Sequence, residues 1–221
     1  MPIGKESVVI RIIALFLFAV LFTLTALTPA YGQDALPSFS PQIRLLVHGT
    51  KVLKDMEEAK PSVGLGMWVI EPNILDANPQ AQTTLGLRLS TNTTWIEFLG
   101  GGVVSPTTTG VFNPVFDVRA FADLGVHLFS EVSLYGDAAY WYVSADAPIK
   151  SGGKMLFKIG GEAEGAKTYR NTGGFFAAGP HVVIPWGDHF ATMVVFQFRI
   201  EPTATVPIVS TVGRLYAIVN F

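Results

Sequence analysis

The residues best suited to acid–base or nucleophilic chemistry are four histidines, His48, His127, His181 and His189. In nucleophilic catalysis, a histidine must lie within hydrogen-bond reach of the nucleophile, and a His-x-Ser pair on one strand face provides that reach. The residue two positions after each histidine is a threonine, a phenylalanine, a valine or an alanine, so no His-x-Ser pair occurs. The chain also has no cysteine that could act as a nucleophile or a metal ligand. This pattern predicts that the protein is not an enzyme.

A catalytic triad could still be assembled from separate strands, for example from His127, Asp123 and Ser133. A lone histidine on a strand carries little information, so we expect His127 and His181 to be lumen or rim residues. The four histidines lack the spacing of metal ligands. The glycine run 100–102 is not followed by a helix, which a phosphate-binding loop requires. We therefore expect no catalytic residue, no metal and no cofactor.

A second set of candidate residues is charged and lies in stretches that alternate apolar and polar residues with a period of two, which is typical of β-strands. Asp117 and Arg119, for example, are separated by Val118. These stretches contain almost no lysine, and arginine suits an interior because its planar fork binds carboxylates bidentately. If the strands close into a narrow barrel, these residues face a lumen that side chains just fill. We predict a lumen ion-pair network of Arg88, Glu97, Asp117, Arg119, Asp123, Asp137, Arg199, Glu201 and Arg214.

The alternating stretches are longer than typical soluble strands of about five or six residues. A tilted membrane-spanning strand needs about 9 to 11 residues. Two shorter segments, 43–48 and 155–159, could also be strands. We therefore predict an all-β fold, an eight-stranded antiparallel up-and-down transmembrane barrel, with ten strands as the alternative. The eight predicted strands are 62–71, 82–90, 94–104, 113–128, 131–144, 173–186, 189–202 and 208–221.

The predicted connections alternate between tight turns and longer loops. Turns near 91–93, 129–130 and 187–188 are tight, whereas the other connections are mostly longer and rich in Pro, Gly, Thr and charged residues. Short turns on one rim and long loops on the other are typical of bacterial outer-membrane barrels, whose strand number is even. The longest connection, 145–172, is the main candidate for a binding loop, because loops on a rigid scaffold often carry function.

The first 32 residues are predicted to be a cleaved signal peptide. Lys5 and Arg11 precede an apolar run, and small residues end it at Gly32, with Ala30 as the alternative cleavage position. We expect an N-terminal periplasmic segment at 33–60 and the barrel at 61–221. The formal net charge of −2 gives no reason to expect nucleic acid as a partner.

The chain resembles the small eight-stranded outer-membrane barrels, such as the OmpA transmembrane domain and the OmpX and OmpW groups. The signal peptide, the long hairpins and the alternating C-terminal end carry this resemblance, which covers roughly residues 62–221. It implies an outer-membrane location, contact with lipid and lipopolysaccharide, and a C-terminal segment that the barrel-assembly machinery recognises. That assembly signal would be Leu215, Ala217, Val219 and Phe221.

The function that these observations favour is a non-enzymatic outer-membrane barrel for envelope integrity, surface interaction or a narrow pore. In such a barrel the apolar residues of each strand would face the lipid and the charged residues would face the lumen, because a membrane barrel is apolar outside and polar inside. Two alternatives stay open: a lipid-modifying enzyme, and a soluble periplasmic barrel that binds an apolar ligand. Aromatic residues near predicted strand ends favour the membrane, where they would form girdles: Trp68, Trp95, Tyr140, Tyr142, Phe175, Phe176, Trp186 and Phe190.

Overall fold

The computed structural model describes residues 38–55, 61–76, 80–104, 112–169, 173–202 and 206–221. The predicted signal peptide lies outside these ranges. Within them, no helix has the length and the apolar character needed to cross a membrane. The strands are β1 (Ser38–Lys54), β2 (Ser62–Glu71), β3 (Ala81–Ser90), β4 (Thr94–Val104), β5 (Asn113–Asp123), β6 (His127–Tyr135), β7 (Ala138–Ser151), β8 (Lys154–Thr168), β9 (Gly174–Pro185), β10 (Phe190–Glu201) and β11 (Ile208–Asn220).

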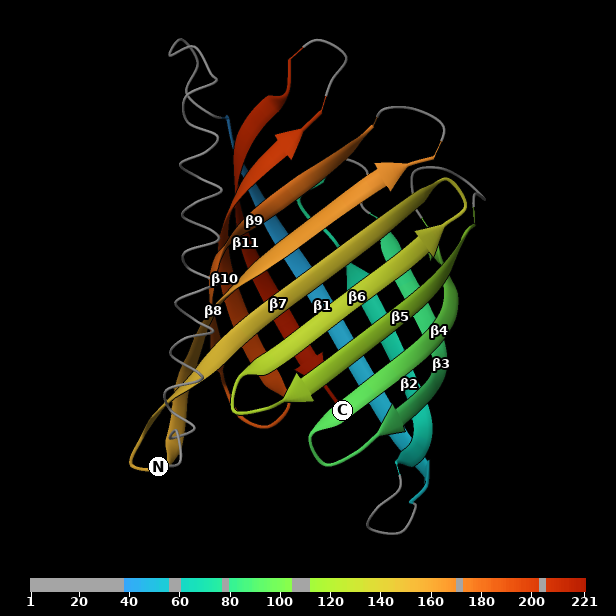
Figure 1. Ribbon diagram of the computed structural model, residues 1–221, viewed down its shortest axis with the longest axis vertical. Coiled ribbons are helices and arrows are strands. Elements are labelled where there is room, and N and C mark those ends of the chain that lie inside the picture. Colours follow the sequence, from blue (N-terminus) through green and yellow to red (C-terminus); the bar gives the residue numbers. More distant parts are fainter. Residues whose placement is uncertain (1–37, 56–60, 77–79, 105–111, 170–172, 203–205) are drawn as a thin grey trace, which may run out of the picture. The chain divides into compact units, whose positions relative to one another are not determined.

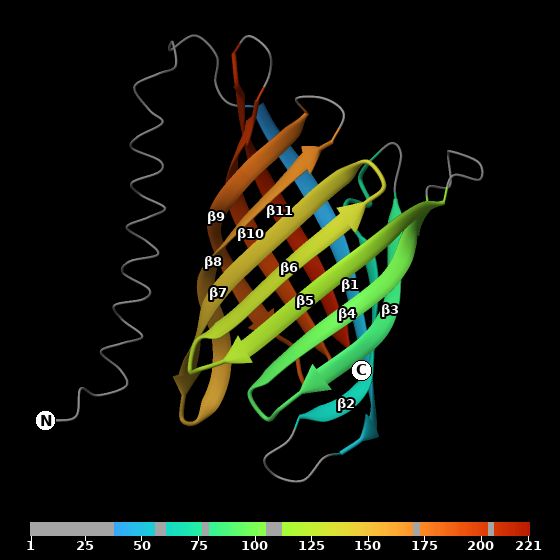
Figure 2. The same ribbon diagram turned by 45° about the vertical axis from the view of Figure 1, so that its right-hand side comes forward.

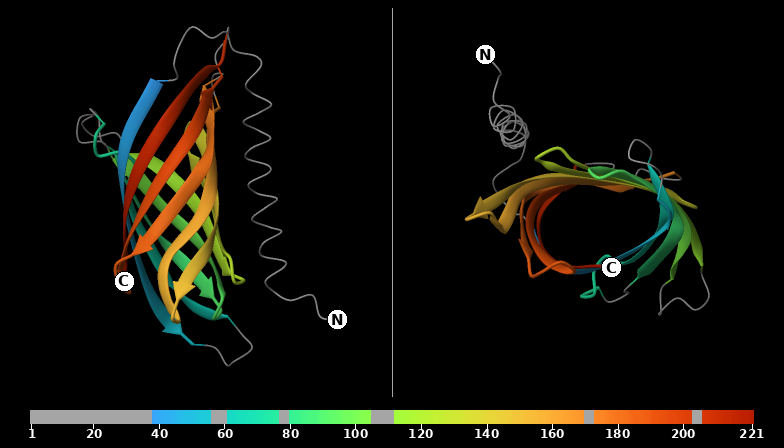
Figure 3. Two further views of the ribbon diagram at one scale, coloured as in Figure 1. Left: turned by 90° about the vertical axis from the view of Figure 1, so that its left-hand side faces the viewer. Right: turned by 90° about the horizontal axis from the view of Figure 1, so that it is seen from below.

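The strands form one closed barrel in which each strand pairs with its neighbours in the chain, and β1 pairs with β11 (Figures 1 and 2). Seen from below, they make a closed ring (Figure 3). All consecutive pairs are antiparallel. Because the strand number is odd, β1 and β11 must run in the same direction. The Phe221 N–H donates to the His48 carbonyl at 2.9 Å and the Thr50 N–H donates to the Phe221 carbonyl at 3.1 Å, which fits a parallel pair.

The prediction of an all-β up-and-down barrel is confirmed, but the predicted strand numbers of eight and ten are both wrong, because the barrel has eleven strands. β1 contains the short segment 43–48 and lies within the range 33–60, for which we expected a periplasmic segment. β8 contains the other short segment, 155–159. The expected binding loop 145–172 is instead the end of β7, a turn at Gly152-Gly153 and most of β8.

The remaining extra strand comes from the region 113–144, which we predicted to be two strands. The structure divides it into β5, β6 and the first half of β7. The expected turn at 129–130 lies in the middle of β6, and the real turns are at 124–126 and 136–137. Gly125, in the first of these turns, has a φ of +85°, a left-handed conformation that favours glycine.

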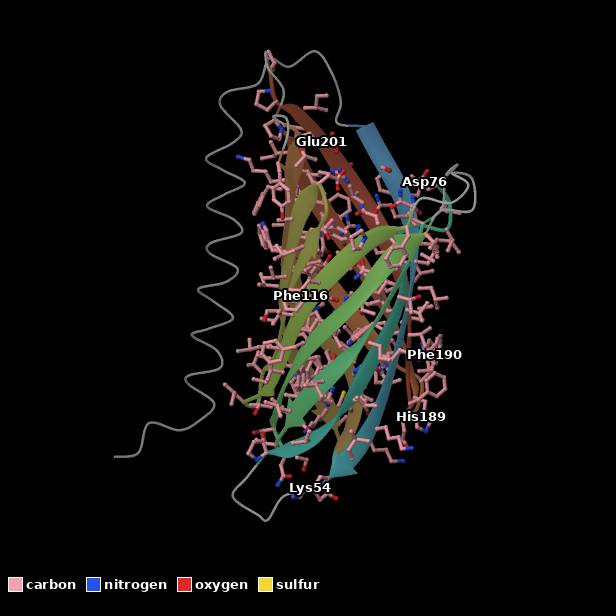
Figure 4. All side chains as sticks on the ribbon, turned by 90° about the vertical axis from the view of Figure 1, so that its right-hand side faces the viewer. Lys54, Asp76, Phe116, His189, Phe190 and Glu201 are labelled. Carbon is pink, nitrogen blue, oxygen red and sulfur yellow. The ribbon has the colours of Figure 1, made fainter. Side chains whose placement is uncertain are left out.

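The two rims differ in the length of their connections. One rim carries the short connections at 91–93, 124–126, 152–153 and 186–189, and we call it the short-turn rim. The opposite, long-loop rim carries most of the longer connections, although the tight turn 136–137 also lies there. Lys54 and His189 mark the short-turn rim in Figure 4, and Asp76 and Glu201 mark the long-loop rim.

The two faces of the wall have opposite character. Along β3, β4 and β5, apolar side chains face outward, and Leu87 and Phe116 are 56% and 50% exposed. The residues that alternate with them face the lumen and are buried, including Glu97 and Asp117, which are both 0% exposed. Phe116 can be located on the barrel wall in Figure 4. The structure is therefore apolar outside and charged inside.

Candidate functional site

The lumen holds most of the buried charged residues, and Glu97 on β4 is the centre of its first cluster. Its carboxylate accepts hydrogen bonds from Arg88 on β3 at 2.7 Å and from the Trp68 indole N–H on β2 at 2.7 Å. It also lies 3.0 Å from Nε2 of His48 on β1. Gly66 on β2 makes this reach possible, because a Cβ at that position would collide with the Glu97 carboxylate. Glu97 thus connects four neighbouring strands from inside the barrel.

The second cluster is centred on Arg119 of β5. Its guanidinium binds the Asp117 carboxylate, with Nε at 2.7 Å, and the Glu131 carboxylate at 3.1 Å. The Ser133 hydroxyl donates to Glu131 at 2.9 Å and lies 3.2 Å from Asp117. The guanidinium also stacks over the Trp68 ring, 4.3 Å from its centroid. One buried arginine therefore bridges two carboxylates, and the Ser133 hydroxyl lies within hydrogen-bond distance of both.

The third cluster surrounds Glu164 on β8 and closes the barrel across the β1–β11 junction. Arg214 on β11 binds Glu164 through Nη2, and Arg44 on β1 binds it at 3.3 Å. The Tyr140 hydroxyl donates to the same carboxylate at 2.8 Å. Arg214 also donates through Nε to Gln42 on β1 at 2.7 Å. These bonds link β1 to β8 and β11 through the lumen.

Glu162, two residues earlier on β8, has a separate set of partners. It accepts hydrogen bonds from the Tyr142 hydroxyl at 2.7 Å and from the Gln197 amide at 2.6 Å. Gln197 lies two strands away on β10, and the intervening residue on β9 is Gly179, which has no side chain to block the contact. Unlike Gly66, this glycine lies against the backbone of β10, where a Cβ would collide with the Phe196 carbonyl.

A row of titratable residues lies closer to the short-turn rim. His127, Asp146, Gly160 and His181 are aligned across β6, β7, β8 and β9. Asp146 lies 3.7 Å from Nδ1 of His127 and 3.9 Å from Nε2 of His181, and Lys158 lies 3.9 Å away. These distances are too long for hydrogen bonds. Among the described residues, no three His, Asp or Glu side chains are placed to hold a metal ion.

The structure does not assemble the possible triad of His127, Asp123 and Ser133. His127 lies 3.5 Å from Asp123, but the Ser133 hydroxyl is bonded to Asp117 and Glu131. Activation of a serine requires a base within about 2.6–3.2 Å of its hydroxyl, and no such contact joins His127 to Ser133. The described geometry provides no activated nucleophile at this position.

The residues predicted for the lumen network divide into two groups. Arg88 with Glu97, Asp117 with Arg119, and Arg214 lie inside the barrel in buried ion pairs. The others lie toward the rims or outside the lumen. Arg199 pairs with Glu201 at 2.8 Å near the long-loop rim, and the Asp123 side chain is 48% exposed. Asp137 is an exposed residue of the turn 136–137, so it does not belong to the network.

Several central lumen residues are absent from the predicted network. Arg44 lies in the segment 43–48, which we expected only as a possible strand. Glu162 and Glu164 lie in the range 145–172, for which we expected a loop, although Glu162-Ala163-Glu164-Gly165 alternates charged and small residues with a period of two. Trp68 and Tyr142, which we expected in outer girdles, are buried in the lumen. Alternation of charge with small residues was the signal that could have revealed β8.

The lumen side chains leave a cavity of about 470 Å³. Aromatic residues of β2, β5 and β6 line one part of it, namely Trp68, Phe121 and Phe129, and aliphatic residues of β9, β10 and β11 line another. Arg44, Glu131, Asp146 and Lys158 also face this space.

The predicted assembly signal lies on the outer face of β11 and just beyond its end. Leu215 is exposed, Ala217 and Val219 are partly exposed, and Phe221 is 71% exposed at the short-turn rim. Arg214 and Tyr216, which alternate with them, are buried in the lumen. The side chain of Phe221 is thus available at the rim, while its backbone joins β11 to β1.

Comparison with known proteins adds no relative. A scan against protein-family models finds no match to the chain. A search of curated proteins and a search of solved structures also find no match.

Proposed function

We propose that this chain is a non-enzymatic outer-membrane β-barrel with a narrow, largely obstructed lumen. The observation that carries the proposal is the inverted distribution of side chains, with exposed Leu, Val and Phe on the outer face and paired charges inside. In water, such an outer face would be a large apolar patch, which soluble monomers rarely expose. In a bilayer, the same face is solvated by lipid tails.

This distribution disfavours the soluble ligand-binding barrel. A soluble barrel packs its apolar face inward and its charged face toward water. Here Leu85, Leu87 and Phe98 are 55%, 56% and 44% exposed on adjacent strands, whereas Glu162 and Glu164 are fully buried. The alternative of a lipid-modifying enzyme has no positive support among the described residues, because the serine of the candidate triad is bonded elsewhere.

Side chains that cross the lumen argue against a wide pore. Glu97 spans from β4 to β1, and Glu164 spans from β8 to β1. We propose roles in envelope integrity or surface interaction, with at most a narrow conducting path. By analogy with outer-membrane barrels, the short-turn rim would face the periplasm and the long-loop rim the exterior. Phe221 would then be presented to the barrel-assembly machinery on the periplasmic side.

Extraction and gel mobility test the proposal. We expect the protein to fractionate with outer membranes, to require detergent for release, and to shift in apparent mass when a detergent-solubilised sample is boiled. Release without detergent, together with no shift on boiling, would refute the membrane assignment. Planar-bilayer recordings then test the obstructed lumen, for which we expect small or no conductance steps. Large, stable steps would contradict it.

A further inference from the structure

The lumen cavity is bounded by two walls of different chemistry. The aromatic wall consists of Trp68, Phe121 and Phe129 on β2, β5 and β6. Their rings belong to a connected aromatic group, because Trp68 and Phe129 have centroids 6.1 Å apart. Trp95 stacks on Phe121 at 5.9 Å and contacts Phe129 at 6.0 Å. Such mutual packing holds the rings in fixed positions. His48 stacks on Trp68 at 4.1 Å and Arg119 lies over the same ring at 4.3 Å, so Trp68 offers the cavity its edge rather than its face.

The aliphatic wall lies on another arc of the barrel. Val183 on β9 and Met193 on β10 form a buried apolar cluster with Tyr216, and Ile218 on β11 and Leu46 on β1 pack against it. In the ring of strands, β9, β10, β11 and β1 follow one another, and β5 and β6 lie on the far side from β11 and β1, whereas β2, which carries Trp68, pairs directly with β1. An apolar body within the cavity would therefore contact Phe121 and Phe129 on one side, and on the other the aliphatic chains together with the rings of Phe175 and Tyr216.

Polar groups also line this cavity: Arg44, Arg119 and Glu131 face it, and further polar residues lie toward each rim. Gln82 and Tyr135 lie near the long-loop rim, where the Tyr135 hydroxyl donates to Gln82 at 2.8 Å. Asp146 and Lys158 lie toward the short-turn rim. Oδ1 of Asp146 has no hydrogen-bond partner among the described residues. A ligand with one O–H or N–H group would find an acceptor there.

We propose that the lumen binds a small planar aromatic molecule that carries one hydrogen-bond donor, such as a phenol or an arylamine. The cavity volume of about 470 Å³ lies within the usual range for small-molecule sites, about 300–1,000 Å³. The aromatic wall favours flat rings over acyl chains, because rings gain from offset or edge-to-face stacking. This inference rests on the proposed function as an outer-membrane barrel and names the class of ligand that its lumen would bind.

Binding of N-phenyl-1-naphthylamine, a flat arylamine, tests the proposal with the full-length folded barrel in detergent micelles. We expect a saturable rise in probe fluorescence with one site per barrel, above the background of empty micelles. Met193→Trp places a bulky ring in the cavity and should weaken binding at least about tenfold. Val194→Trp adds the same ring at the next residue, which faces outward and is 52% exposed, and should leave binding unchanged. Val183→Phe is the second filling variant if Met193→Trp does not fold.

Every variant is first checked for the mobility shift on boiling, so that a failure to form the barrel is distinguished from a failure to bind. An unsaturable rise that is equal for wild type, Met193→Trp and Val194→Trp would overturn the proposal, since the probe would then be in the micelle. Competition separates the ligand classes: 1-naphthol should displace the probe more effectively than decanoate. Stronger displacement by decanoate would assign the cavity to acyl chains and overturn the aromatic assignment.

Discussion

The two faces of the β3–β4 pair show how differently the barrel uses neighbouring residues. Leu87 faces outward opposite Phe98, and both are exposed. Arg88, the next residue, faces inward opposite Glu97 and forms a 2.7 Å ion pair with it. The outer face needs only apolar character, whereas the inner face depends on particular partners at particular distances. The two faces should therefore fail for different reasons when they are mutated.

The largest expected effect is on the inner face. Glu97→Ala removes the shared partner of Arg88, His48 and Trp68 and leaves a partly buried guanidinium without its carboxylate. Breaking a buried ion pair typically costs about 3–5 kcal/mol, so we expect the free energy of unfolding to fall by about that amount. Urea unfolding of vesicle-inserted protein, followed by tryptophan fluorescence, measures it. Glu97→Gln, which keeps the shape and part of the hydrogen bonding, should lose less, and a loss below about 1 kcal/mol for Glu97→Ala would contradict the network.

The next effect is on the outer face and distinguishes lipid from water. Leu85→Arg places a charge in the middle of β3, where the outer face would contact the bilayer core, and should cost about 2–4 kcal/mol. Leu89→Arg, on the same face but close to the short-turn rim, should cost about 0–1 kcal/mol. The same unfolding measurement in vesicles compares the two. Equal, small costs at both positions would indicate that this face does not lie in lipid.

A smaller effect is expected where a glycine lets two strands approach closely. Gly179→Ala adds a methyl group between Glu162 and Gln197, against the backbone of β10, and should destabilise the barrel by about 1–3 kcal/mol through overpacking. Gly100→Ala is the matched control, because a Cβ there meets nothing within 4 Å, and its effect should stay within about 0.5 kcal/mol. Equal unfolding midpoints for both variants would show that Gly179 is not needed for the contact.

The smallest effect on stability is expected at the C-terminus. The Phe221 side chain is 71% exposed, so Phe221→Ala should change the free energy of unfolding by no more than about 0.5 kcal/mol. If Phe221 is read during assembly, the same variant should lower the amount of heat-modifiable barrel in cells. Phe116→Ala, an outward phenylalanine within a strand, serves as the comparison. An unchanged cellular yield for Phe221→Ala would remove the assembly role.

The faces of the strands could be predicted from the sequence more easily than their number. The alternation around Asp117 and Arg119 correctly separates outward from inward residues. It does not reveal the turn at 124–126, because three connecting residues leave Ala122 and Leu128 on the same outward face. The alternating pattern therefore runs through the turn as if the strand continued. Gly125, with its positive φ, was the available signal.

The turn at 136–137 has the opposite effect, because two connecting residues change which alternate positions face outward. Leu134 faces outward before the turn and Trp141 faces outward after it, so Tyr140 and Tyr142 are lumen residues rather than outer ones. A single unrecognised turn therefore moved both tyrosines to the wrong face.

The second half of β8, beyond the predicted segment 155–159, escaped prediction because its outer face there is made of small residues. Ala163 and Gly165 replace the large apolar residues found on other strands. The structure covers Gly165 with the Trp141 ring of β7, and Phe176 of β9 packs beside that ring at 5.9 Å. An aromatic residue that covers a glycine on the next strand is a known device of β-sheets. Only the pairing of three strands reveals it, and the sequence of β8 alone does not.

The prediction of an even strand number, which is typical of bacterial outer-membrane barrels, was wrong because the pairing of β1 depends on residues distant in the chain. The sequence of β1 alone does not predict which strand it pairs with. Its inward residues Gln42, Arg44 and His48 find partners on β11, β8 and β4, all distant in the chain. The Gln42–Arg214 contact and the backbone bonds of Phe221 hold β1 against β11 as a parallel pair. A parallel pair allows an odd number of strands, which also occurs among membrane barrels.

Lipid contact at single tryptophans tests the central claim most directly. The chain has four tryptophans. Two single-tryptophan variants, with the other three changed to phenylalanine, would keep either the outward Trp141, which is 37% exposed, or the lumen Trp68, which is 7% exposed. In vesicles of brominated phospholipid, we expect strong fluorescence quenching of Trp141 and little quenching of Trp68. Quenching of Trp68 with an unquenched Trp141 would show that the charged face, and not the apolar one, meets the membrane.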